Sequence, residues 1–220
     1  MSSAKKVIPA VIPYDKDQFI KWASELNKFF SEIHIDVIDQ SYDTPSWFNE
    51  NEIFEILKGF KKITVHLMIV NPVIFLLEKQ KYLLRDNVTY LLDMQTVFID
   101  NFATLKDTGY KLGVVANPGV EPRLMENYYQ SCDEFLFLTV NPGQSGQQPD
   151  FLVLTRLNTF LDITKLDFGK KIISVDGGFS EQNAAKFKET KVNIIYANSF
   201  FAKTGIEAAL KTLSSLKINY

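Results

Sequence analysis

Cysteine is almost absent from this 220-residue sequence. The single cysteine, Cys132, has no partner within the chain with which to form a disulfide. The first six residues lead into a short segment broken by prolines, which is unlike the apolar core of a signal peptide. We therefore expect a cytoplasmic protein that works in a reducing compartment.

The sequence also lacks a large excess of charge and a long apolar run. Lys and Arg number 24 and Asp and Glu number 26, and the basic residues form no stripe that would hold a phosphate backbone. The longest apolar stretch, residues 63–77, is interrupted by His66 and by the pair Asn71-Pro72, so it is too broken to span a bilayer. We expect no nucleic-acid partner and no membrane partner, and a small molecule becomes the favoured ligand.

What the chain does contain is an alternation of short apolar, β-branched runs with longer amphipathic stretches. This alternation is typical of βαβα proteins, and the length suits one core, so we expect residues 1–220 to form a single domain. About eight such units fit a single (β/α)₈ TIM barrel with its active site at the C-terminal face, with an open doubly wound sheet as the alternative. Strands are expected at residues 6–12, 32–38, 63–69, 88–92, 111–116, 134–140, 171–175 and 193–197.

Helices are expected between these strands, because apolar residues there recur at three- and four-residue spacing. Examples are residues 16–30, 52–60, 96–106 and 202–216. Ser180 is expected to cap a helix N-terminus, and residues 107–109 are expected to form a helix exit before the fifth strand.

Polar residues at strand ends are the candidates for the functional site, since parallel barrels place their active sites there. In the second strand, alternation puts His34 and Asp36 on one face. His66, the only other histidine, lies in the third strand, and Asp176 ends the seventh, just before a pair of glycines. Two imidazoles and two carboxylates suit Zn²⁺, Fe²⁺, Mn²⁺ or Co²⁺. Alternatively, each histidine is a hydrogen-bonded core residue and Asp176 caps a turn.

Five sequence blocks resemble those of the ribulose-phosphate 3-epimerase family, in the same order and at similar separations. They are residues 34–39 (HIDVID), 65–68 (VHLM), 117–119 (NPG), 139–143 (TVNPG) and 175–178 (VDGG). The resemblance spans nearly the whole chain. It implies an isomerase of carbohydrate metabolism, in the pentose phosphate pathway, that interconverts D-ribulose 5-phosphate and D-xylulose 5-phosphate.

The resemblance also implies roles for individual residues. One divalent metal ion would be bound by His34, Asp36, His66 and Asp176, and the two aspartates would be the acid and base that remove and return the proton at C3 through an enediolate. Substrate and phosphate contacts would come from His66, Met68, Gly143, Gly146, Gly177, Gly178, Asn198 and Ser199. The glycines also have an alternative reading as ordinary loop residues.

The chain departs from the family pattern around the expected pocket. Ala10 stands where the family commonly has serine, and Gln40 and Asn198 stand where it has glycine. Gln144-Ser145-Gly146 replaces an aromatic-Gly-Gly run, and Ile38 and Leu138 replace two methionines. Asn198 tolerates the left-handed backbone that glycine favours. These changes alter the walls of the pocket and the phosphate cradle and leave the proposed metal ligands and proton carriers intact.

Several functional alternatives stay open. A related hexulose 6-phosphate is a second candidate substrate, and a barrel that binds a sugar phosphate without catalysis is a further possibility. A decarboxylase or aldol-type synthase on the same fold is disfavoured, because the Asp-x-Lys-x-x-Asp pattern of such relatives is absent near Asp36. Whether the chain forms a homo-oligomer stays open as well.

Overall fold

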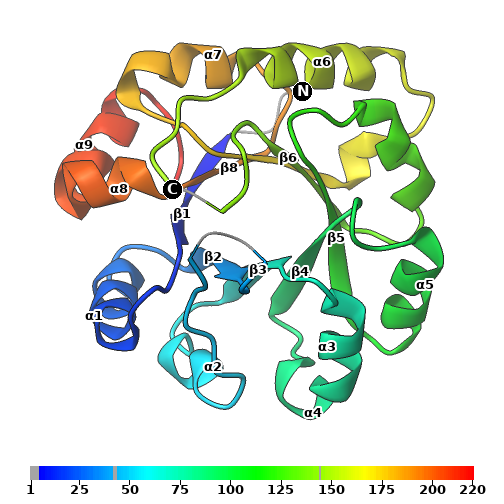
Figure 1. Ribbon diagram of the computed structural model, residues 1–220. Helices are drawn as coiled ribbons and strands as arrows, with labels where there is room; N and C mark the ends of the chain where they lie inside the picture. The colour runs from blue at the N-terminus through cyan, green and yellow to red at the C-terminus, as the bar shows by residue number, and fades with distance from the viewer. Residues whose placement is uncertain (1–4, 42–43, 144) are drawn as a thin grey trace.

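The computed structural model describes residues 5–41, 44–143 and 145–220. Eight parallel strands close into one barrel in sequence order, and helices surround it (Figure 1). The strands are β1 (Lys6–Val11), β2 (Glu32–Ile38), β3 (Lys62–Met68), β4 (Val88–Asp93), β5 (Lys111–Ala116), β6 (Glu134–Leu138), β7 (Ile172–Asp176) and β8 (Ile194–Ala197). The expected (β/α)₈ barrel is confirmed, and the open sheet is excluded because β1 pairs with β8.

The strands form where they do because both of their faces are buried. One face packs on the helices in a large apolar layer, and the other fills the barrel interior. The interior apolar residues are Ile8, Ala10, Leu91, Val115, Leu136, Leu138, Ile194 and Tyr196. The β2–β3 register is continuous over both strands and places Asp36 directly beside His66.

The outer layer is formed by α-helices and short 3₁₀ turns. The α-helices are α1 (Lys16–Asn27), α2 (Ile53–Ile56), α3 (Pro72–Glu78), α4 (Gln80–Leu83), α5 (Ile99–Asp107), α6 (Phe151–Ile163), α7 (Ala184–Lys188), α8 (Ser199–Thr204) and α9 (Ile206–Ser215). The 3₁₀ turns are η1 (Pro122–Tyr128), η2 (Phe168–Lys170) and η3 (Glu181–Asn183). None of the helices in the described ranges is both long and apolar enough to cross a membrane.

Two expected helices are wrong in extent. The helix predicted at residues 52–60 is limited to α2, since Gly59 disfavours helix and the side chain of Asn27 occupies the space where a β-carbon would lie. The helix predicted at residues 202–216 is divided into α8 and α9 by Gly205, which has a φ of 79°. The strand ends agree with the expected ends to within two residues.

Both predicted helix-boundary signals are confirmed. Ser180 and Asn183 form a capping box at the start of η3. α5 ends at Asp107, and Gly109 turns the chain with a φ of 98°.

Candidate metal centre and active site

A cavity opens at the C-terminal ends of the strands. Its floor is formed by Asp36 from β2, His66 and Met68 from β3, and Asp176 from the end of β7. The loops after β6, β7 and β8 form its walls. The position is where barrels of this kind place their active sites.

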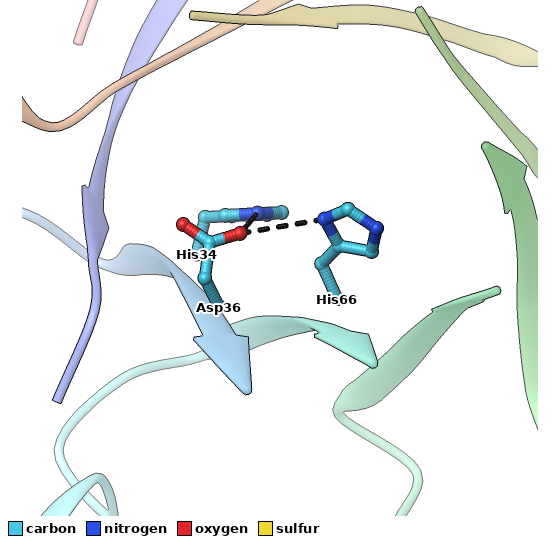
Figure 2. Close-up of side chains that lie close together, drawn as sticks. All are labelled: His34, Asp36 and His66. Carbon is cyan, nitrogen blue, oxygen red and sulfur yellow. Dashed lines mark hydrogen bonds and ion pairs between the residues drawn. The ribbon is translucent and has the colours of Figure 1, made fainter. Parts of the chain in front are cut away.

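Three of the four predicted ligands lie together on β2 and β3 (Figure 2). His34 Nε2 is 3.2 Å from Asp36 Oδ1, and His66 Nδ1 is 3.4 Å from the same oxygen. The candidate ligand atoms lie within 4.8 Å of one another. Ligands about 2.1 Å from a shared ion are at most about 4.2 Å apart, so small side-chain shifts would let these three bind one ion.

Asp176 lines the same cavity from β7, three strands away from β2 round the barrel. Among the described residues, the tight three-residue cluster does not extend to it. Its backbone is fixed to the neighbouring strand end, because Thr139 donates hydrogen bonds from its amide, at 2.8 Å, and from its hydroxyl, at 3.0 Å, to the Asp176 carbonyl. Asp176 and Asp36 therefore approach the cavity from different strands, separated by β1 and β8.

The imidazole of His66 is held at both nitrogens by carboxylates. Its Nε2 lies 3.4 Å from Asp93 Oδ2, and both side chains are almost completely buried. A carboxylate behind a ligating histidine fixes the orientation and tautomer of the ring. Asp93 was missed in the sequence, although it follows the apolar run of residues 88–92 and meets the same criterion that identified Asp176.

The charges of this cluster stabilise one another. Burial alone would raise the pKa of Asp36, but the neighbouring His34 and His66 hold it below its ordinary value. Burial likewise would lower the pKa of His66, but Asp93 and Asp36 raise it to about 10. Without a bound cation, Asp36 is therefore ionised and His66 protonated at neutral pH.

Asp176 has the opposite electrostatic character. Burial and the nearby negative charge of Asp36 raise the pKa of Asp176 to about 7. Two carboxylates in one cavity thus have widely separated pKa values, an arrangement that is typical of acid and base pairs in active sites.

The residues predicted for the phosphate end lie together along one wall of the cavity. They are Gly143, Gly146, Gly177, Gly178, Asn198 and Ser199. Packing alone explains two of these glycines. A β-carbon at Gly177 would lie 2.5 Å from Val140 Cγ2, one at Gly178 would lie 2.5 Å from Pro149 Cδ, and both residues have positive φ. Their identity is therefore no independent evidence for a phosphate.

Lys203 on α8 is a further residue that the sequence did not single out. Its ammonium lies 3.6 Å from the position of a β-carbon at Gly146. It lines a second cavity, of about 320 Å³, which shares Gly146, Gly178 and Ser199 with the first. Lys203 is the only Lys or Arg among the described residues that line this second cavity, and Glu181 lines it as well.

The departures from the family pattern fall in different places. Ala10 is buried in the barrel interior, as are Ile38 and Leu138. Asn198 has a φ of −97°, so the left-handed geometry that asparagine tolerates is not used there. Gln144 lies outside the described residues, and Ser145 lines the cavity.

Solved structures with this architecture include variants of the tryptophan synthase alpha-subunit from Pyrococcus furiosus. One superposes with a TM-score of 0.66 and 17% identity, over 99% of this chain and 100% of that chain. At this level of identity the likeness shows the TIM-barrel fold alone.

Curated relatives at higher identity are named ribulose-phosphate 3-epimerases. The protein from Aquifex aeolicus is 30% identical over 200 residues, which are 85% of each chain. The protein from Synechocystis is 31% identical over 181 residues, which are 76% of this chain and 74% of that one. The family model of the ribulose-phosphate 3 epimerases matches residues 6–202. The chain belongs to the ribulose-phosphate 3-epimerase family, a family of isomerases that act on carbohydrates.

Proposed function

We propose that this chain is a metal-dependent epimerase that interconverts D-ribulose 5-phosphate and D-xylulose 5-phosphate at C3. The observation that carries the proposal is the convergence of His34, Asp36 and His66, with Asp176 in the same cavity, at the C-terminal end of the barrel. Family membership makes a pentose phosphate the first substrate to test.

The donor set fits a divalent transition metal. It consists of imidazole nitrogens and carboxylate oxygens without thiolates, which suits Zn²⁺, Fe²⁺, Mn²⁺ or Co²⁺. We propose that His34, Asp36, His66 and Asp176 hold the ion. His34 Nε2 and His66 Nδ1 both face Asp36 Oδ1, at 3.2 and 3.4 Å, so a nitrogen of each ring and this carboxylate oxygen are directed to one point. When bound, such an ion acts as a Lewis acid that stabilises negative charge on the substrate oxygens.

Asp36 and Asp176 are the proposed proton carriers. Inversion at C3 requires removal of a proton from one face of the carbon and its return to the other, so the two carriers have to lie on different sides of the substrate. Asp36 comes from β2 and Asp176 from β7, with two strands between them in the sheet. The lowered pKa of Asp36 suits a base, and the raised pKa of Asp176 suits an acid. Reversal of the reaction exchanges the two roles.

The phosphate end of the substrate is proposed to lie against the loops after β6, β7 and β8. Gly146, Gly178 and Ser199 line that wall, and backbone amides in such loops are common phosphate ligands. Lys203 would add a charge-assisted contact. His66 and Met68 would contact the reacting end of the sugar.

A related hexulose 6-phosphate is the alternative substrate. The observation that favours it is the second cavity beyond Gly146 and Ser199, which would leave room for a phosphate one carbon further from the metal centre. The ratio of kcat/KM for the two substrates distinguishes them. A barrel that binds a sugar phosphate without catalysis would show affinity for both and turnover of neither.

We further propose that residues 1–220 act as one cytoplasmic domain that forms a homo-oligomer. Apolar side chains are exposed on and just before α3 and α5, which are neighbours in the outer layer (Figure 1): Val70, Ile74, Leu77, Phe98 and Ile99. An exposed apolar face of this kind is typical of protein interfaces. Light scattering on the wild type and on a Phe98→Ser variant tests this proposal, and a monomeric wild type contradicts it.

Deuterium exchange tests the proposed reaction. Ribulose 5-phosphate is incubated in deuterated water with protein that has been treated with a chelator, with and without added Mn²⁺, Co²⁺, Zn²⁺ or Fe²⁺. We expect deuterium to enter C3 only with metal, and we expect Asp36→Asn and Asp176→Asn to abolish the exchange. Exchange that is independent of metal, or no exchange with pentulose and hexulose phosphates under any of these conditions, would overturn the proposal.

A further inference from the structure

Polar side chains occupy a level of the barrel interior on the N-terminal side of the metal cluster. Thr64 and Ser174 each lie two residues before a proposed ligand, His66 and Asp176 respectively, so they face the interior one level further from the cavity. Glu134, the first residue of β6, lies at the same end of the barrel. All three side chains are buried.

Glu134 is the centre of this polar network. Its Oε1 accepts hydrogen bonds from Ser174 Oγ at 2.7 Å and from the Tyr196 hydroxyl at 2.6 Å. Its Oε2 is buried and has no hydrogen-bond partner among the described residues. Burying a carboxylate in this way is costly, and costly groups that a fold retains tend to serve a functional site.

Tyr196 connects the network to the metal centre. Its hydroxyl donates to Glu134 and lies 3.3 Å from Thr64 Oγ1, so the end of the side chain is fixed. Its ring stacks on the imidazole of His34, with centroids 4.1 Å apart and an interplanar angle of 29°. Both side chains are completely buried.

Among the described residues, Tyr196 is the only aromatic side chain that stacks on the imidazole of His34. Ligating histidines usually donate their second N–H to a carboxylate or a carbonyl, and the Nε2 of His66 has Asp93 in that place. In contrast, the Nδ1 of His34 makes no hydrogen bond with the described part of the chain. Both histidines contact Asp36, but their second support differs: His66 has the carboxylate of Asp93, and His34 has the ring of Tyr196.

We propose that Tyr196, anchored by Glu134, is the positioning residue that orients the imidazole of His34 and thereby sets the affinity and geometry of the metal site. This inference rests on the proposed function, since it requires that His34 bind a metal ion. Tyr196 acts through His34 and does not itself touch the substrate cavity.

A network that only filled the barrel interior would affect stability and leave metal binding unchanged. Tyr90 provides a matched control, because it is also a completely buried strand tyrosine, and its hydroxyl donates to the Leu83 carbonyl in the outer layer. Replacement of either tyrosine by leucine removes a comparable volume and one hydroxyl. Only the loss of Tyr196 removes a ring that contacts His34.

The test is a Co²⁺ titration of full-length protein freed of metal with a chelator, followed by visible absorption. We expect Tyr196→Leu to bind Co²⁺ about 10- to 100-fold more weakly than the wild type and to change the absorption bands. Tyr90→Leu is expected to bind within about twofold, whatever its Tm. Glu134→Gln retains a hydrogen-bond acceptor and is expected to bind within about twofold as well.

Tyr196→Phe provides a second test that does not depend on whether the leucine variant folds. This variant keeps the ring and loses the hydrogen bond from the hydroxyl to Glu134, so we expect Co²⁺ binding about 3- to 10-fold weaker than in the wild type. The proposal would be overturned if Tyr196→Phe binds Co²⁺ as tightly as the wild type and Tyr196→Leu either does the same or fails to fold. It would also be overturned if Tyr90→Leu loses as much Co²⁺ affinity as Tyr196→Leu. A wrong proposed function would be recognised differently: the wild type itself would bind no Co²⁺ at this site or would exchange no deuterium at C3 of the substrate.

Discussion

Replacement of Asp176 by asparagine should stabilise the metal-free protein at alkaline pH while it removes activity. Burial and the charge of Asp36 raise the pKa of Asp176 from 3.8 to about 7. In the unfolded chain this carboxyl loses its proton near its ordinary pKa, whereas the metal-free fold retains the proton up to about pH 7. The fold therefore loses stability as the pH rises through this interval.

The pKa values set the size of the effect. A rise from 3.8 to about 7 corresponds to at most about 4 kcal/mol of folding free energy at pH 8. Asp176 is only partly buried, so water screens much of this penalty. We expect Asp176→Asn to gain about 1–2 kcal/mol at pH 8, or about 2–8 °C in Tm, and to gain nothing near pH 4.

The assay is thermal and urea unfolding in the presence of a chelator, from pH 4 to pH 9, with the exposed Asp133→Asn as the matched control. Added metal should reverse the order of stability, because the wild type gains the free energy of ion binding. Epimerisation by Asp176→Asn should fall by at least about 100-fold. A variant that is less stable than the wild type at pH 8 without metal, or a stability difference that is independent of pH, would refute the electrostatic reasoning.

Three further results are expected. Asp93→Asn should weaken Co²⁺ binding about 10-fold, because His66 loses the carboxylate that orients it; unchanged affinity in the visible titration would contradict this role. Lys203→Met should raise KM for ribulose 5-phosphate about 10-fold and leave kcat within about twofold of the wild type. Lys211 is an exposed lysine on α9, and Lys211→Met should leave both constants unchanged. Equal KM values for the two variants would exclude a contact between Lys203 and the phosphate. Metal binding at pH 7.5 should release about one proton, since the raised pKa of His66 keeps the free imidazole protonated and the ion displaces that proton. Calorimetry in buffers of different ionisation enthalpy measures the number of protons released. A metal affinity that does not rise with pH would contradict this prediction.

Much of the barrel could be predicted because its strands have a strong local signal. Each strand is an apolar, β-branched run that is buried on both faces, so the pattern reports the strand directly. The helices depend more on their surroundings. Gly205 divides the helix predicted at residues 202–216, and the close approach of Asn27 to Gly59 accompanies the early end of the helix predicted at residues 52–60. The spacing of apolar residues shows neither effect.

The proposed ligands were also accessible from the sequence, because strand alternation places His34 and Asp36 on one face and the β2–β3 register adds His66. Asp93 could have been found by the same rule. The contact of Tyr196 with Glu134 could not, since it joins β8 to β6 across the interior and depends on how the barrel closes. The approach of Lys203 to Gly146 likewise depends on the path of a loop.

The most direct test of the metal centre is a crystal structure of the protein loaded with Mn²⁺, Co²⁺ or Zn²⁺, with the ion located by anomalous scattering. The account predicts one strong peak about 2.0–2.3 Å from His34 Nε2, His66 Nδ1 and a carboxylate oxygen of each of Asp36 and Asp176. An ion bound elsewhere, or one that leaves either histidine or Asp176 unligated, would contradict it.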